Sequence, residues 1–165
     1  ETILPAYKKA EVVRALLATH PYEEPAFDIY PLQNHWAQVG SGVIGELEEA
    51  ETETGFLKRI KKTFEVGCLK HNKLIGREIK TVALCGGAGA FLIPLAVRKN
   101  ADVFITGEIK YHYYFGHDQE ILLAEIGHYE SEQYTKEIFH TIIRDLYPNF
   151  ALYISKVNTN PIKYI

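Results

Sequence analysis

A histidine and a glutamate four residues apart, His128 and Glu132, are the side chains whose types and spacing point most directly to chemistry. They follow the short apolar run 121–126, which a glycine ends and which is typical of a buried strand. Apolar residues at helical spacing then continue to Leu146, so a helix beginning at about residue 129 or 130 is predicted. The sequence therefore places His128 where a strand gives way to a helix, with Glu132 one turn further on and facing the same way.

An imidazole and a carboxylate on one helix face can hold a divalent metal ion, or two ions if the carboxylate bridges them. In open α/β sheets, ligands bind outside the carboxyl ends of the strands, which is where this pair is expected. The same spacing also fits an ordinary histidine at a helix start, with Glu130 and Glu132 favoured there by the helix dipole. Spacing alone leaves both interpretations open.

A second acid and imidazole, Glu108 and His112, follow the preceding predicted strand at 101–106. If a helix starts in the segment 106–112, these two side chains could face the same crevice as His128 and Glu132. Acid–base or metal-type groups at the ends of two successive strands are the pattern expected of a functional site, although each residue alone is more often structural.

The glycine-rich turn 86–89 (Gly-Gly-Ala-Gly) joins the predicted strand 80–85 to a helix. The backbone amides of Gly86, Gly87 and Gly89 could cradle a phosphate at the helix N-terminus. The turn is not a GxGxxG fingerprint, because position 92 is leucine, and it lacks the lysine and hydroxyl residue of a P-loop. The competing interpretation is a tight turn that lets the helix pack closely on the sheet.

Composition indicates an ordinary globular protein. The 165 residues are 47% hydrophobic and 24% charged, enough for one domain with a sizeable core. A net charge of −3 without a basic block gives no electrostatic case for binding nucleic acid or an anionic membrane. Cys68 and Cys85 lack metal-ligand spacing, so a reducing, cytoplasmic compartment is expected. The chain begins at Glu1 and contains no methionine, so we expect a cleaved or cloned piece of a longer chain.

The alternation of strands and helices predicts an α/β sheet with parallel neighbours. The polar segment 33–38 marks a domain boundary, and the strand–helix–strand order before it resembles half of a ferredoxin-like unit. The charge run 48–53 predicts a turn and a helix start. Further helices are predicted over 8–19 and 54–64, and further strands over 26–32, 39–47, 66–70, 150–154 and 162–165.

Four motifs occur together and in order along the chain. They are Thr-His-Pro-Tyr-Glu-Glu-Pro-Ala-Phe-Asp-Ile-Tyr-Pro-Leu (19–32), Cys-Gly-Gly-Ala-Gly (85–89), Thr-Gly-Glu-Ile-Lys-Tyr-His (106–112) and Gly-His-Tyr-Glu-Ser-Glu (127–132). On these motifs the chain resembles the Nif-three-like family, whose members are also called GTP cyclohydrolase 1 type 2 homologs. The resemblance covers nearly the whole chain.

The resemblance implies an α/β domain with a dinuclear metal site, often interrupted by a ferredoxin-like (CutA-like) insert, and assembly into ring-shaped hexamers. The family's GH-x-x-x-E metal ligands fall on His128 and Glu132, with zinc, manganese or iron as the expected ions. The family's His-His-Pro ligands are absent from this sequence. The resemblance therefore assigns residues 1–36 to the tail of the insert and 37–165 to the second, C-terminal half of the metal domain, with an incomplete site.

The function implied is that of a piece of a metal-dependent hydrolase acting on a phosphoester or nucleotide-like substrate. Glu108 or His112 would move protons, and the turn 86–89 would contact the substrate. The resemblance implies that the protein associates with copies of itself. No residue of the sequence indicates specific recognition of a guanine ring. One alternative is a non-catalytic, ring-forming regulatory or assembly protein with a structural metal. Another is a nucleotide-binding module built on the turn 86–89.

Overall fold

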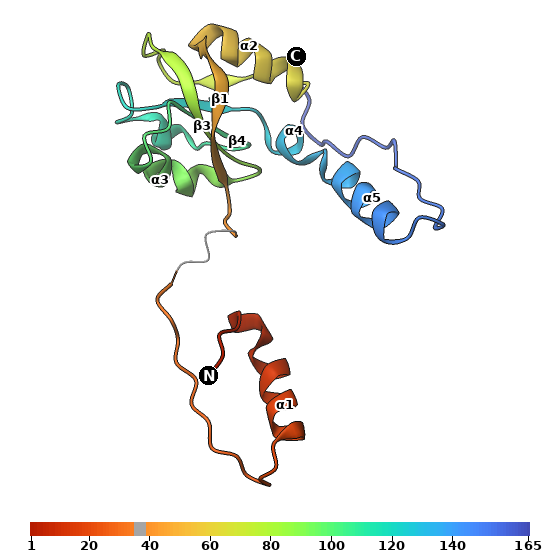
Figure 1. The fold of residues 1–165 in the computed structure, drawn as a ribbon. Coiled ribbons are helices and arrows are strands. Elements are labelled where there is room, and N and C mark those ends of the chain that lie inside the picture. The colour runs from red at the N-terminus through yellow and green to blue at the C-terminus, as the bar shows by residue number, and fades with distance from the viewer. Residues whose placement is uncertain (35–38) are drawn as a thin grey trace. The chain divides into compact units, whose positions relative to one another are not determined.

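The computed structural model describes residues 1–34 and 39–165 (Figure 1). The chain divides into two compact units, Glu1–Ala37 and Gln38–Ile165. Part of the boundary predicted at 33–38 falls on residues 35–38, which lie outside the described residues. Each unit is therefore described by itself.

The described residues of the first unit contain one α-helix. A 3-10 turn, η1 (Ala6–Lys8), leads into α1 (Lys9–Thr19), which confirms the helix predicted over 8–19. The strand predicted at 26–32 is wrong, because this segment belongs to no ladder. Strand backbone needs a neighbouring strand to take up its hydrogen bonds, and no described strand pairs with it.

The second unit is built on a mixed five-stranded sheet in the order β1–β3–β4–β5–β2. The strands β3, β4 and β5 are parallel, which confirms the predicted α/β architecture, whereas the edge strands β1 and β2 are antiparallel to their neighbours. The strands are β1 (Val43–Thr52), β2 (Lys70–His71), β3 (Glu78–Cys85), β4 (Val103–Thr106) and β5 (Leu122–Glu125).

The register brings the carboxyl ends of the parallel strands level with one another. Cys85 lies opposite Thr106, and Thr106 lies opposite Glu125. The glycine turn, the loop after β4 and the turn after β5 therefore all begin at one edge of the sheet. Ligands bind at this edge in open α/β sheets, so the register assembles the candidate site.

Helices cover both faces of the sheet, with α2 and α3 on opposite sides (Figure 1). Phe56 of α2 packs with Val103, while Ile93 of α3 packs with Phe104 on the other face. Successive strand residues point to opposite faces, so β4 contributes to both cores. In residues 1–34 and 39–165, no helix is long and apolar enough to cross a membrane. The helical elements are α2 (Glu53–Thr63), η2 (Gly89–Leu92), α3 (Ile93–Arg98), η3 (Tyr111–Tyr114), α4 (His128–Glu132) and α5 (Thr135–Leu146).

The turn predicted for the charge run 48–53 is wrong, because β1 continues through this run to Thr52. The predicted helix start is found at Glu53, where α2 begins. The second half of β1 pairs with β3, with Glu51 opposite Ile79, after a break in register that begins at Glu46. As an edge strand, β1 can expose charged side chains to solvent and still keep its ladder. Charge therefore did not signal a turn here.

Three other predicted strands also differ from the structure. The prediction at 66–70 overlaps β2 only at Lys70, and Val66 packs in the core from outside any strand. The strands predicted at 150–154 and 162–165 are wrong, since the tail after α5 has no regular structure. The tail is held instead by side-chain contacts, such as that from Asn160 Nδ2 to Glu130 Oε1 at 3.1 Å.

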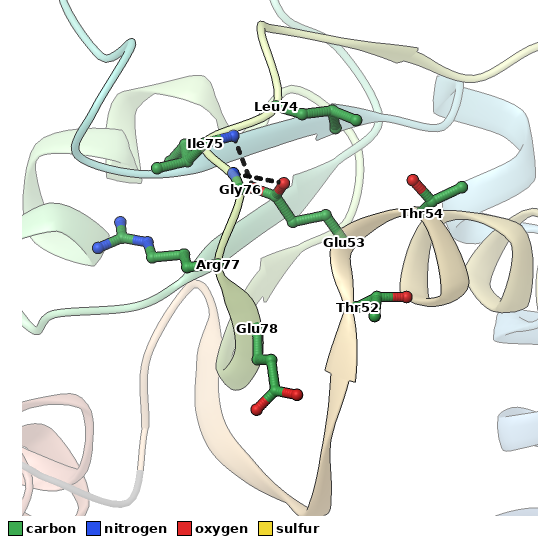
Figure 2. Close-up of a pocket in the computed structure, with 8 residues that line it drawn as sticks. All are labelled: Thr52, Glu53, Thr54, Leu74, Ile75, Gly76, Arg77 and Glu78. Carbon is green, nitrogen blue, oxygen red and sulfur yellow. Dashed lines mark hydrogen bonds between the residues drawn. The ribbon is translucent and has the colours of Figure 1, made fainter.

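A hollow at the junction of β1 and α2 is organised by the Glu53 carboxylate (Figure 2). This side chain is buried and accepts hydrogen bonds from the backbone amides of Ile75 and Gly76, at 2.8 and 2.9 Å. Both of its oxygens are therefore committed to the turn that precedes β3. The other residues that line the hollow are Thr52, Thr54, Leu74, Arg77 and Glu78.

Candidate metal site at the carboxyl edge of the sheet

His128 lies between two carboxylates. Its Nδ1 is 2.7 Å from Oε1 of Glu108, and its Nε2 is 3.3 Å from Oε2 of Glu132. Helix α4 begins at His128 itself, close to the predicted start, so His128 and Glu132 do face the same way one turn apart. The three side chains are about half exposed, at 44%, 55% and 52% for His128, Glu108 and Glu132.

The electrostatic environment favours a proton on the His128 ring. The hydrogen bond to Glu108 raises the pKa of His128, burial acts in the opposite direction, and the charge of Glu132 adds to the increase. In the neutral ring, Glu108 can accept the proton of Nδ1, which leaves the lone pair of Nε2 facing Glu132. A carboxylate behind the ring is the usual way in which proteins orient a metal-binding histidine.

The distance between His128 Nε2 and Glu132 Oε2 fits two ligands of one ion. Tetrahedral zinc with bonds of about 2.0–2.2 Å places adjacent ligand atoms about 3.4 Å apart, which is close to the observed 3.3 Å. Glu108 binds the opposite ring nitrogen, so it does not converge on the same point. In the parts of the chain that the structure describes, no three His, Cys, Asp or Glu residues are grouped to hold a metal. The described residues therefore offer two adjacent candidate ligands and no larger group.

The glycine turn uses two of its amides within the protein. Gly87 N donates to Ser131 Oγ at 2.9 Å, and Gly89 N donates to Thr106 Oγ1 at 3.0 Å. The Thr106 hydroxyl in turn donates to the carbonyl of Gly87 at 3.1 Å. These two amides are therefore not free to cradle a phosphate, while Gly86 is exposed.

Gly87 is favoured as glycine by its backbone conformation, and it faces the His–Glu pair. Its φ of +61° is one that L side chains rarely adopt, and an added Cβ would lie 2.5 Å from Glu132 Oε1 and 3.3 Å from His128 Nε2. Gly86 is less constrained, with its nearest contact to Glu132 at 3.6 Å. The geometry thus favours the interpretation of residues 86–89 as a tight turn, which here lets the backbone lie close to His128 and Glu132.

The hydroxyl of Ser131 joins three segments of the site. It donates to the carbonyl of His128 at 2.8 Å while it accepts the Gly87 amide. An added Cβ at Gly107 would lie 2.7 Å from this hydroxyl, so β4 must also end close to it. Sequence reasoning did not single out Ser131 or Gly107. Their only sequence signal is their place inside the motifs 106–112 and 127–132.

His112 is not brought to the His–Glu pair. The condition for that arrangement, a helix carrying both residues, is not met, because the backbone stays irregular until η3 begins at Tyr111. Glu108 and His112 therefore do not share a helix face. The exposed His112 ring instead makes an edge contact with Tyr111, with ring centroids 5.4 Å apart.

The fold and the site define an α/β protein with a histidine–carboxylate pair at the carboxyl edge of its parallel strands. The sequence model of the Duf34/NIF3 (NGG1p interacting factor 3) family matches residues 8–161. The chain therefore belongs to the Duf34/NIF3 family.

Curated relatives cover the whole chain. The protein called GTP cyclohydrolase 1 type 2 homolog from Halalkalibacterium halodurans is 36% identical over 100% of this chain and 45% of its own length. The protein of the same name from Bacillus subtilis is 31% identical, with the same coverage of both chains. The chain thus spans somewhat less than half the length of these relatives.

Solved structures show the same fold. Staphylococcus aureus protein SA1388 matches with a TM-score of 0.77 and 28% identity, over 100% of this chain and 55% of that chain. A Bacillus cereus protein related to NIF3 matches with a TM-score of 0.72 and 29% identity, over 98% of this chain and 46% of that chain. The α/β fold with its mixed sheet therefore corresponds to part of a longer NIF3-like structure.

Proposed function

We propose that this chain is part of a metal-dependent hydrolase in which His128 and Glu132 hold a divalent ion such as zinc, manganese or iron. The observation that carries the proposal is the 3.3 Å separation of His128 Nε2 and Glu132 Oε2, with Nδ1 already taken by Glu108. A bound ion supplies a Lewis acid and an activated water for attack on a phosphoester or nucleotide-like substrate.

The residues of this chain divide the remaining work. Glu108 holds the His128 ring through Nδ1, and its exposed carboxylate is the better placed of the two predicted proton carriers. His112 contacts Tyr111 instead and receives no role from the geometry. Because Gly87 has no side chain, His128 and Glu132 can lie close to the turn at the sheet edge. In this proposal the exposed Gly86 is the residue of the turn that contacts the substrate.

On the family resemblance, we propose that the complete site holds two ions. The relatives are more than twice as long as this chain, and we assign the missing ligands to the part of them that it does not span. We likewise assign residues 1–36 to the tail of a ferredoxin-like (CutA-like) insert and residues 37–165 to the C-terminal half of the metal domain. The exposed apolar face of α5, with Ile138 and Phe139, supports self-association as part of the proposal.

The proposed ligands are tested by calorimetric titration of zinc and manganese into this chain and into His128→Ala. His112→Ala is the matched control, because it removes an exposed histidine that lies away from the pair. Binding that is lost in His128→Ala and kept in His112→Ala is expected. Equal binding in both variants would overturn the assigned site.

Catalysis is tested in a protein of the relatives' full length, loaded with metal and offered a panel of phosphoesters and nucleotides. Turnover that His128→Ala abolishes supports the hydrolase. Loss of assembly in His128→Ala, without turnover in the unsubstituted protein, supports the alternative of a ring-forming regulatory protein with a structural metal. The nucleotide-binding alternative is disfavoured by the two committed amides in the glycine turn.

A further inference from the structure

The loop between β4 and β5, residues 107–121, has to hold Glu108 in place. Its only regular element is η3, and it is much longer than the usual connection of about 4–6 residues in compact domains. Glu108 itself is exposed, yet its carboxylate lies 2.7 Å from His128 Nδ1. The Glu108 backbone is held by the hydrogen bond from its amide to the carbonyl of Gly87 at 3.0 Å, and contacts further along the loop add to this restraint.

Tyr114 provides such a contact. Its hydroxyl donates to Oε2 of Glu125 at 2.8 Å, and Oε1 of the same carboxylate pairs with Nζ of Lys70 at 2.5 Å. Lys70 and Glu125 are directly opposed in the antiparallel pair of β2 and β5. The Glu125 side chain is only 11% exposed, so a buried charge is balanced by one cation and one hydroxyl.

Both donors are present at neutral pH. Burial, followed by the hydrogen bond to Glu125, raises the pKa of Tyr114, so the phenol keeps its proton. The hydrogen bond to Glu125 likewise raises the pKa of Lys70, so the ammonium keeps its charge. Removing either donor would leave one oxygen of a largely buried carboxylate without a partner, which costs stability.

These contacts connect the same two segments that carry Glu108 and His128. Tyr114 lies six residues after Glu108 in the loop, and Glu125 lies three residues before His128 at the end of β5. Ile109 and Tyr114 also pack on the same hydrophobic cluster, which holds the backbone between Glu108 and η3. The loop and the end of β5 are therefore joined by the Glu108–His128 contact, by the Tyr114–Glu125 contact and by the backbone hydrogen bond from Gly127 N to Gly107 O at 3.1 Å.

We propose that Tyr114, held by Glu125 and Lys70, is a positioning residue that keeps the Glu108 carboxylate on Nδ1 of His128. The effect on metal binding rests on the proposed function, whereas the effect on the imidazole does not. Positioning partners of metal-binding histidines typically change metal affinity 10–100-fold when they are removed.

The first test uses Tyr114→Phe in the metal-free protein, with Tyr113→Phe as the matched control, because Tyr113 is a half-exposed tyrosine in the same turn. The ring nitrogen chemical shifts of His128, recorded with the imidazole neutral, show which nitrogen carries the proton. We expect Nδ1 to carry it in the unsubstituted protein and in Tyr113→Phe, and a mixture of both tautomers in Tyr114→Phe. An unchanged ring spectrum in Tyr114→Phe would overturn the proposal.

The second test is a double-mutant cycle on zinc affinity. Tyr114→Phe should weaken binding about tenfold when Glu108 is present and should have no further effect in Glu108→Ala, because alanine already removes the carboxylate that Tyr114 is proposed to position. Equal weakening in both backgrounds would show a merely structural role and refute the positioning role. If the unsubstituted chain binds no zinc, the proposed metal site fails in this chain, while the ring spectrum still decides the present proposal. If Tyr114→Phe does not fold, Lys70→Gln tests the same contact from the other oxygen of Glu125.

Discussion

Removing the hydroxyl of Ser131 should destabilise the site from its centre. In Ser131→Ala the buried Gly87 amide loses its acceptor, and the carbonyl of His128 loses a donor. An unsatisfied buried amide costs about 1–3 kcal/mol, while a typical intramolecular hydrogen bond contributes about 0.5–1.5 kcal/mol. We therefore expect the free energy of unfolding to fall by about 1–3 kcal/mol, with the acceptorless amide as the larger contribution.

Urea denaturation measures this effect, and Ser155→Ala is the matched control. Ser155 accepts one hydrogen bond, from Val157 N, in the exposed tail, so its loss should change stability by less than about 0.5 kcal/mol. At a urea dependence of about 2 kcal/mol per molar, Ser131→Ala should lower the midpoint by about 0.5–1.5 M. The two variants should differ clearly. Equal midpoints would refute the reasoning that this hydroxyl supports the glycine turn.

Two further substitutions test the geometry around the pair. Gly87→Ala should abolish zinc binding, because the added Cβ would meet Glu132 Oε1 at 2.5 Å. It should also lower the free energy of unfolding by about 1 kcal/mol or more, because the φ of this residue is positive. The control Gly45→Ala, whose Cβ meets nothing within 4 Å, should retain zinc binding in the same titration. Glu108→Gln should return the raised pKa of His128 toward about 6.5, which a nuclear magnetic resonance titration of the metal-free protein measures. The raised pKa of His128 means that protonation of its ring stabilises the folded protein. The unsubstituted protein should therefore be more stable than Glu108→Gln below about pH 6.5, and this difference should vanish as the pH rises through the raised pKa. A difference in stability that grows with pH would contradict this assignment.

Local patterns predicted the parts of the fold that depend on nearby residues. The apolar face of α2, with Phe56 and Ile60, follows from helical spacing and lies in the core as expected. The alignment of His128 with Glu132 also needed only a helix that begins near residue 128. Such features are encoded within a few turns of chain, where geometry is set by backbone conformation.

Patterns failed where pairing, not propensity, decides the conformation. The charged half of β1 is strand because β3 lies beside it, with Glu51 opposite Ile79. The segment 150–154 has strand-type residues but pairs with no strand of the described part of the chain, so it stays irregular. A strand exists only when a second strand accepts its hydrogen bonds, and a single segment cannot specify that partner.

The sequence by itself determined the α/β class with parallel central strands, the core-facing helices and the placing of His128 and Glu132 one helical turn apart. Only the tertiary structure decided that Glu108 binds the other side of the His128 ring and that Ser131 accepts the amide of Gly87. These contacts join residues 20 and 44 positions apart. They depend on the register of the parallel strands β3, β4 and β5, which packing of the whole core sets and which no local spacing records.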